Sequence, residues 1–131
     1  MADPIIYVDQ SEIKKGKINE VKEAIKELSE FIETNEPQII AYNVYITNDD
    51  TEMTVLHVHT DSASLETHMK IAGPKFSKFV NLIRLLRIDI YGSPSTELLE
   101  QLQAKAKLLG DASVQVYKYH AGFSRFGIHD K

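Results

Sequence analysis

Cysteine is absent from this chain of 131 residues, which excludes disulfides, thiolate nucleophiles and Cys-ligated metals. Long runs of Lys or Arg are absent too, and the formal charge of −4 argues against nucleic acid or an anionic membrane as a partner. No segment approaches the roughly 20 consecutive apolar residues that a membrane helix needs. Small molecules and other proteins remain as partners.

Apolar residues make up 43% of the chain and charged residues 26%, which suits one compact core. We therefore predict a single domain over residues 1–131. The N-terminus has Asp3 and Pro4 where a signal peptide would carry positive charge and then an apolar stretch, so a cytoplasmic location is expected. The chain has no Gly-rich phosphate loop and no nucleophile elbow, which disfavours nucleotide chemistry and serine-type hydrolysis.

Four runs rich in β-branched and aromatic residues predict strands. These runs are residues 5–9, 38–46, 52–60 and 84–91. The second and third are joined by a polar segment with the length and composition of a hairpin loop, so they should pair antiparallel. A turn containing Gly16 is expected over residues 11–17, directly after the first run.

Two segments between these runs predict amphipathic helices. From residue 18 to residue 32, apolar residues recur at intervals of three and four, and Pro37 prevents continuation. A second helix should begin at Asp61 or Ser62, because either side chain can cap exposed amides. Gly73-Pro74 should kink or split this second helix.

The order β-α-β-β-α-β is the ferredoxin-like arrangement of the α+β class, in which two helices cover one face of a four-stranded antiparallel sheet. Residues 93–131 extend beyond this core of residues 1–92. The extension predicts a third amphipathic helix, a C-cap at Gly110 and a fifth strand over residues 114–120. We expect it to lengthen the sheet edge or to clasp a partner.

Side chains alternate along strands, so each face of the sheet can be considered separately. The more apolar set is expected under the helices: Ile6, Val8, Ile40, Tyr42, Val44, Ile46, Leu56, Val58, Leu86, Ile88 and Ile90. The opposite set is mixed: Ile5, Tyr7, Asp9, Ile39, Ala41, Asn43, Tyr45, Met53, Val55, His57, His59, Leu85, Arg87, Asp89 and Tyr91. In water the mixed set would form a larger apolar patch than monomers usually expose. We therefore predict a homodimer in which two such faces enclose a lined cavity.

Over residues 4–92 the chain resembles the dimeric α+β barrel superfamily, and within it the antibiotic-biosynthesis-monooxygenase-like domains. The resemblance is carried by the order of elements, the Lys-Lys-Gly-Lys turn at residues 14–17 and the Asp-Ser-Ala-Ser-Leu-Glu-Thr-His-Met segment at residues 61–69. It implies a homodimer that encloses small, often aromatic ligands, which some members oxidise with molecular oxygen using neither metal nor flavin. The haem-degrading branch typically uses a Trp, which this chain lacks. We therefore expect no cofactor.

Three histidines are candidate catalytic residues. His57 and His59 lie two apart on a strand, so they point the same way and could act as base and orienting donor. His68 lies at the margin of the second helix's apolar stripe, and by position it resembles a His found at the start of that helix in many such domains. A metal would need a third ligand, such as His68 or Asp89, and the chain has no HxxEH or HExxH pattern, so we predict no metal site. Histidines that only complete an interface are the alternative.

The candidate ligand-binding residues are Tyr7, Asn43, Tyr45, Arg87, Asp89 and Tyr91. The tyrosines could stack on an aromatic ligand, Asn43 could bind an oxyanion, and Arg87 could receive a carboxylate or enolate. An Arg87–Asp89 ion pair is the structural alternative. The C-terminal cluster is expected to plug a cavity mouth or to pack on the partner; it comprises Tyr117, Tyr119, His120, Phe123, Arg125, Phe126 and His129.

Three functions stay open from the sequence. The first is a cofactor-independent monooxygenase or isomerase acting on a small aromatic or quinol-like substrate. The second is a non-catalytic ligand-binding protein or sensor, and the third is a purely structural dimer. The polar residues among the apolar ones on the mixed face favour the first two.

Overall fold

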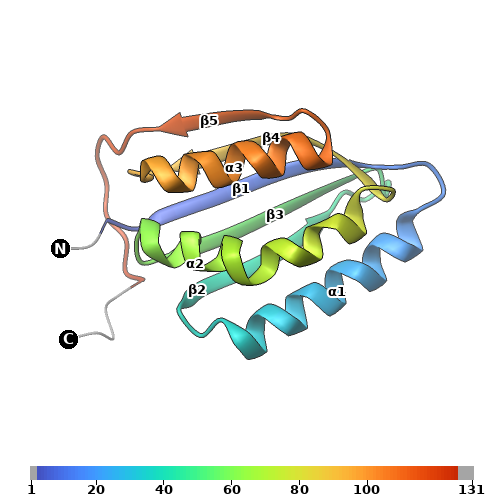
Figure 1. Ribbon diagram of the computed structural model, residues 1–131, viewed down its shortest axis with the longest axis horizontal. Helices are drawn as coiled ribbons and strands as arrows, with labels where there is room; N and C mark the ends of the chain where they lie inside the picture. Colours follow the sequence, from blue (N-terminus) through green and yellow to red (C-terminus); the bar gives the residue numbers. More distant parts are fainter. Residues whose placement is uncertain (1–2, 127–131) are drawn as a thin grey trace.

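The computed structural model describes residues 3–126 and contains one five-stranded sheet with all its helices on one face (Figure 1). The strands are β1 Ile5–Ile13, β2 Ile39–Ile46, β3 Glu52–His59, β4 Ile83–Tyr91 and β5 Ser113–Tyr117. The helices are α1 Ile18–Asn35, α2 Ser62–Ala72, the 3₁₀ helix η1 Gly73–Phe79 and α3 Thr96–Leu109. No helix in this part of the chain is long and apolar enough to cross a membrane.

The strand order is β2-β3-β1-β4-β5, and every pair is antiparallel except β4–β5. The first four strands with α1 and α2 confirm the predicted ferredoxin-like α+β arrangement. The extension adds α3 to the helical layer and β5 to the edge beside β4, which confirms that it lengthens the sheet. Strand β1 is longer than the expected 5–9, because residues 10–13 continue it, so the turn expected over residues 11–17 begins only after Ile13. Strand β5 is shorter than the expected 114–120.

Local sequence signals place the helices. Asp61 accepts a hydrogen bond from the Ser64 amide at 3.0 Å and caps α2. Gly73-Pro74 splits the second helical segment, as predicted: α2 ends and η1 begins at this point. Gly110 ends α3 with φ of +149°, and a Cβ there would lie 2.9 Å from the Leu85 carbonyl oxygen, so only glycine fits.

The expectation about which side chains lie under the helices is wrong for β1, β3 and the first half of β4. The core face carries Ile5, Tyr7, Asp9, Ser11, Ile13, Met53, Val55, His57, His59, Ile83, Leu85, Ile88 and Ile90. The opposite face, which we call the open face, carries Ile6, Val8, Leu56, Val58 and their registered neighbours, with Ala41, Asn43 and Tyr45 on β2. For β2 the expectation is correct at Tyr42, Val44 and Ile46, and for the end of β4 it is correct at Ile88 and Ile90. It is wrong at the start of β2, where Ile40 is 38% exposed and Ile39 packs against the core.

Register shifts explain the change of face on β4 and at the start of β2. The β1–β4 register shifts between Gln10 and Ser11, and the β2–β3 register shifts near Ile39. On β1 and β3 the alternation and their mutual register are unbroken, so the error there has another cause. The prediction assumed that the more apolar face is the core face. The members of the mixed set on β1 and β3 are buried instead, and the helices therefore cover a group of polar side chains.

Candidate functional site

A buried ion pair lies at the centre of this polar group. Lys105 reaches from α3 to the sheet, and its Nζ lies 3.3 Å from Oδ2 of Asp9 on β1. The same ammonium donates to the Tyr7 hydroxyl at 2.6 Å, and that hydroxyl donates to Asp9 at 2.5 Å. The two charged side chains are 9% and 6% exposed. Because desolvating two charges costs several kcal/mol per ion, the pair is a weak source of stability.

Aromatic rings complete the surroundings of the ammonium. Lys105 Nζ lies 4.4 Å from the Phe76 ring centroid and 4.9 Å from that of Tyr7. Burial, and next the charge of Asp9, raise the pKa of the Tyr7 hydroxyl well above its usual range. The phenol therefore keeps its proton at neutral pH and acts as a hydrogen-bond donor.

Tyr42, His57 and Tyr7 stand in a row across β2, β3 and β1, because the sheet register pairs His57 with both tyrosines. The ring of His57 stacks on Tyr7 at 4.1 Å and on Tyr42 at 5.0 Å between centroids. Burial raises the pKa of Tyr42 too, so both hydroxyls remain protonated. The row makes a continuous aromatic floor beside the ion pair.

A chain of hydrogen bonds runs from His57 toward the start of α2. His57 Nδ1 lies 2.7 Å from His59 Nε2, and His59 Nδ1 lies 2.8 Å from the Ser64 hydroxyl. Burial lowers the pKa of His57 far below its usual value and that of His59 to about 3. Both imidazoles are therefore neutral at physiological pH, and each has one donor and one acceptor nitrogen for the chain.

His68 joins the group from α2 with its own carboxylate partner. Its Nδ1 lies 3.1 Å from both carboxylate oxygens of Glu36, the buried residue that follows α1. The ring centroids of His68 and His57 are 4.8 Å apart, so the three predicted histidines do converge. They converge under the helices rather than between two sheets. Among residues 3–126 no three His, Asp or Glu side chains are placed to hold a metal ion.

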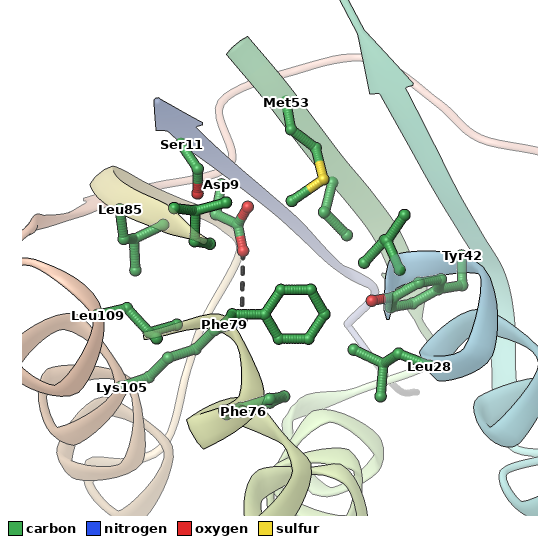
Figure 2. Close-up of a pocket in the computed structure, with 13 residues that line it drawn as sticks. Asp9, Ser11, Leu28, Tyr42, Met53, Phe76, Phe79, Leu85, Lys105 and Leu109 are labelled. Carbon is green, nitrogen blue, oxygen red and sulfur yellow. Dashed lines mark hydrogen bonds and ion pairs between the residues drawn. The ribbon is translucent and has the colours of Figure 1, made fainter. Parts of the chain in front are cut away.

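A cavity of about 30 Å³ lies between the ion pair and the helices (Figure 2). Asp9, Ser11, Lys105 and Tyr42 give it polar walls. Its other walls are apolar: Ile25, Leu28, Met53, Val55, Phe76, Phe79, Ile83, Leu85 and Leu109. A space of this size holds about one water molecule, and its walls combine mainly apolar side chains with a few polar groups.

The remaining predicted ligand-binding residues lie on the open face, away from this cavity. Asn43 and Tyr45 are exposed on β2. Arg87 Nε lies 3.1 Å from Asp89 Oδ2, so the predicted ion pair is present, and Tyr117 donates to Asp89 at 3.1 Å. Asp89 therefore cannot share a ligand with His57.

The aromatic tail lies on the open face as well. Tyr91 stacks on Tyr117 at 4.6 Å, and both line a hollow of about 570 Å³ with Ile6, Phe123 and Phe126. The tail thus lines a hollow at one end of this face. His129, a member of the predicted cluster, lies outside the described residues.

Several central residues of the site were not predicted from the sequence, and Lys105 is the most important of them. Lys105 follows Leu102 by three positions and precedes Leu109 by four, so it lies on the apolar stripe of α3, where a charge is unusual. A lysine at such a position could have been recognised from the sequence as a candidate buried charge. Glu36 gave none, because it stands beside Pro37 in an ordinary helix-ending segment.

Comparison with known proteins gives structural matches only. No protein-family model matches the chain, and no curated protein does. MupZ from Pseudomonas fluorescens matches with a TM-score of 0.72 and 18% identity, covering 93% of this chain and 94% of MupZ. SnoaB, a cofactor-independent oxygenase from Streptomyces nogalater, matches with a TM-score of 0.60 and 15% identity over 72% of this chain and 97% of SnoaB. A Bacteroides thetaiotaomicron protein classed as an antibiotic biosynthesis monooxygenase matches with a TM-score of 0.53 and 19% identity, covering 63% of this chain and 84% of its own.

The chain shares its α+β fold with these three proteins. The MupZ match covers 93% of the chain and therefore includes most of the extension. Within this fold, the lysine of the buried ion pair comes from the extension. The ion pair is thus a feature that the four-stranded core could not provide by itself.

Proposed function

We propose that this chain is a homodimeric enzyme that oxidises a small, enolisable aromatic or quinol-like substrate with molecular oxygen and without a cofactor. The observation that carries the proposal is the buried Tyr7–Asp9–Lys105 group beside a mainly apolar cavity. A fold does not need such a group, because apolar residues of similar volume would be at least as stable. Support also comes from SnoaB, which has this fold and is a cofactor-independent oxygenase.

The charges suit the formation of a substrate anion. A proton leaves the substrate carbon next to its carbonyl and passes to the Asp9 carboxylate. Once Asp9 is neutral, the positive charge of Lys105 is free to stabilise the enolate oxygen, to which Tyr7 also donates. His57 and His59 are too weakly basic to take this proton, so their part is to hold Tyr7 and the substrate ring in place.

The enolate then supplies the electrons for oxidation. One electron passes from the enolate to dioxygen, and the resulting radical and superoxide join through a new carbon–oxygen bond. Loss of water from the peroxide leaves a carbonyl at the substrate carbon that gave up the proton, which was a methylene. One oxygen atom ends in the product and the other in water, so dioxygen is the only oxidant required.

Substrate entry requires a wall of the cavity to move, because about 30 Å³ is smaller than an aromatic ring. The wall that moves is η1, which supplies Phe76 and Phe79. Its seven residues exceed the three or four that 3₁₀ helices usually span, which is typical of a segment under strain. An exposed ion pair between Lys78 and Glu27, at 3.3 Å, ties it to α1 and is easily broken.

The open face supports the homodimer. Ile6, Val8 and Leu56 lie there with Tyr45, Tyr91 and Tyr117, and these three tyrosines are 58%, 39% and 42% exposed. Two copies that pack these faces together would cover this surface and leave each helix-covered site intact. Each protomer therefore has its own active site in this proposal.

A thermal-shift screen against small phenols, quinols and enolisable aromatic ketones, with oxygen uptake followed for every hit, tests the proposal. We expect at least one hit with turnover, loss of uptake in Lys105→Met, and retention in Lys107→Met, an exposed lysine on the same helix. Stabilisation without oxygen uptake would point to a non-catalytic binding protein. No stabilisation by any compound would refute a ligand site in this cavity.

A further inference from the structure

One polar side chain in the cavity wall has no partner. Ser11 is 1% exposed, and its hydroxyl oxygen makes no hydrogen bond. In the part of the chain that the structure describes, only Gln101 Oε1 shares this condition, and Gln101 does not line the cavity. An unpaired buried hydroxyl costs about 1–3 kcal/mol, so its retention calls for an explanation.

The surroundings of Ser11 provide no protein partner. The sheet register places it between Met53 on β3 and Leu85 on β4, and both are apolar. Across the cavity stand Phe79 and Leu109, which are apolar too. Figure 2 shows Ser11 beside Asp9 on the same strand, at the edge of the space that these side chains enclose. A partner for the hydroxyl must therefore come from a molecule inside the cavity.

The spacing of the polar groups limits that molecule. Ser11 is two residues from Asp9, which corresponds to about 6.6 Å along the strand. Asp9 and Lys105 form one polar anchor and Ser11 forms a second, with apolar walls around both. A ligand oxygen lies about 2.8 Å from the anchor to which it is hydrogen-bonded, inside the cavity. The two ligand oxygens are therefore closer to each other than the two anchors are.

We infer that Ser11 is a specificity residue which binds a second oxygen of the substrate, so that the substrate class is a ring with oxygens on two alternate carbons, as in resorcinol. This inference rests on the proposed function, because the first oxygen is the one that becomes the enolate beside Lys105. The second oxygen stays unreacted and fixes the orientation of the ring. A substrate without it leaves the Ser11 hydroxyl unpaired in the bound state as well.

Orcinol and m-cresol test this directly, because they share one methyl-substituted ring and differ by a single hydroxyl. Each probe is titrated into the full-length protein, and binding is followed by amide chemical shifts. We expect wild type to bind orcinol at least about tenfold more tightly than m-cresol, a difference of about 1.4 kcal/mol. In Ser11→Ala this ratio should fall to near one with the affinity for m-cresol retained.

Ser113→Ala is the matched control, because Ser113 is exposed at the start of β5, away from the cavity, and should leave the ratio unchanged. Ser11→Ala removes a hydroxyl that has no partner, so its Tm should equal or exceed that of wild type. An orcinol preference that survives in Ser11→Ala, or equal binding of both probes by wild type, would overturn the inference. Failure of both probes to bind would overturn it as well.

Oxygen uptake, measured on the same samples and on the hits of the thermal-shift screen, separates this inference from the proposed function. A Ser11-dependent orcinol preference without oxygen uptake supports the Ser11 site and refutes the oxygenase. Oxygen uptake with some substrate, but with equal binding of the two probes, supports the oxygenase and refutes the role of Ser11.

Discussion

The buried charges of Asp9 and Lys105 allow a test of whether the site exists for stability or for chemistry. Lys105→Met leaves the Asp9 carboxylate in the core with Tyr7 as its remaining side-chain donor. Asp9→Leu leaves the ammonium 9% exposed, with the Tyr7 oxygen and two aromatic faces around it. Each single change should lower the free energy of unfolding by about 3–5 kcal/mol, the usual cost of breaking a buried pair.

The double variant should behave differently, because it removes both charges together. Leucine and methionine at these positions face Phe76 and the apolar cavity walls, and the cavity beside them takes up part of the extra volume of leucine. Replacing a buried ion pair by apolar residues is often neutral or stabilises a protein by about 1–4 kcal/mol. We therefore expect the double variant to be at least as stable as wild type, and to bind no ligand in the thermal-shift screen.

Urea unfolding followed by far-UV circular dichroism measures all four proteins, since the chain has no Trp to report by fluorescence. The critical comparison is between the double variant and each single variant. If the losses in the two single variants simply add, the two side chains act independently, and the argument that the pair is retained for function fails. If the double variant is stable but still turns over substrate, the assigned site is wrong.

Three further predictions concern the histidines, the glycines and the open face. His59 has a pKa of about 3 in the folded protein, below its unfolded value, so the free energy of unfolding of wild type should fall as pH drops below about 6.5. Between pH 7 and 4.5, measured by urea unfolding, His59→Gln should lose roughly 2–3 kcal/mol less of this free energy than wild type. An equal loss in both proteins would contradict the assigned burial. Gly110→Ala should lower the free energy of unfolding by about 3 kcal/mol, because the new Cβ clashes with the Leu85 carbonyl oxygen and φ is positive. Gly16→Ala, with φ of +78° but no atom within 4 Å of a Cβ, should lower it by about 1–2 kcal/mol in the same assay. Leu56→Lys on the open face should give a monomer in sedimentation velocity, while the control Leu108→Lys on the exposed surface of α3 should stay dimeric. If both variants are dimers, the interface lies elsewhere.

The elements themselves were predictable because their signals are local. The helix before Pro37, the hairpin between β2 and β3, and the break at Gly73-Pro74 follow from periodicity, turn composition and proline geometry. Which face of each strand the helices cover was not predictable from such local signals. Both faces of β1 and β3 carry apolar residues, so alternation alone could not decide which of them the helices cover.

The candidate site shows the same division. That His57 and His59 point the same way follows from their spacing on one strand, and the sequence was sufficient for it. That they meet His68, Tyr7 and a lysine from the extension depends on how α2 and α3 pack on the sheet. Lys105 is 96 residues away from Asp9 in the chain, and no local pattern relates the two.

The sequence by itself determined the order of strands and helices, since each depends on side chains a few residues apart. Only the tertiary structure decided that the helices cover the polar members of β1 and β3, that an ion pair lies among them, and that Ser11 faces a cavity. These features depend on the β-sheet register shifts and on the docking of α3. Both arise from contacts between segments far apart in the chain, and such contacts exist only after the layers have packed.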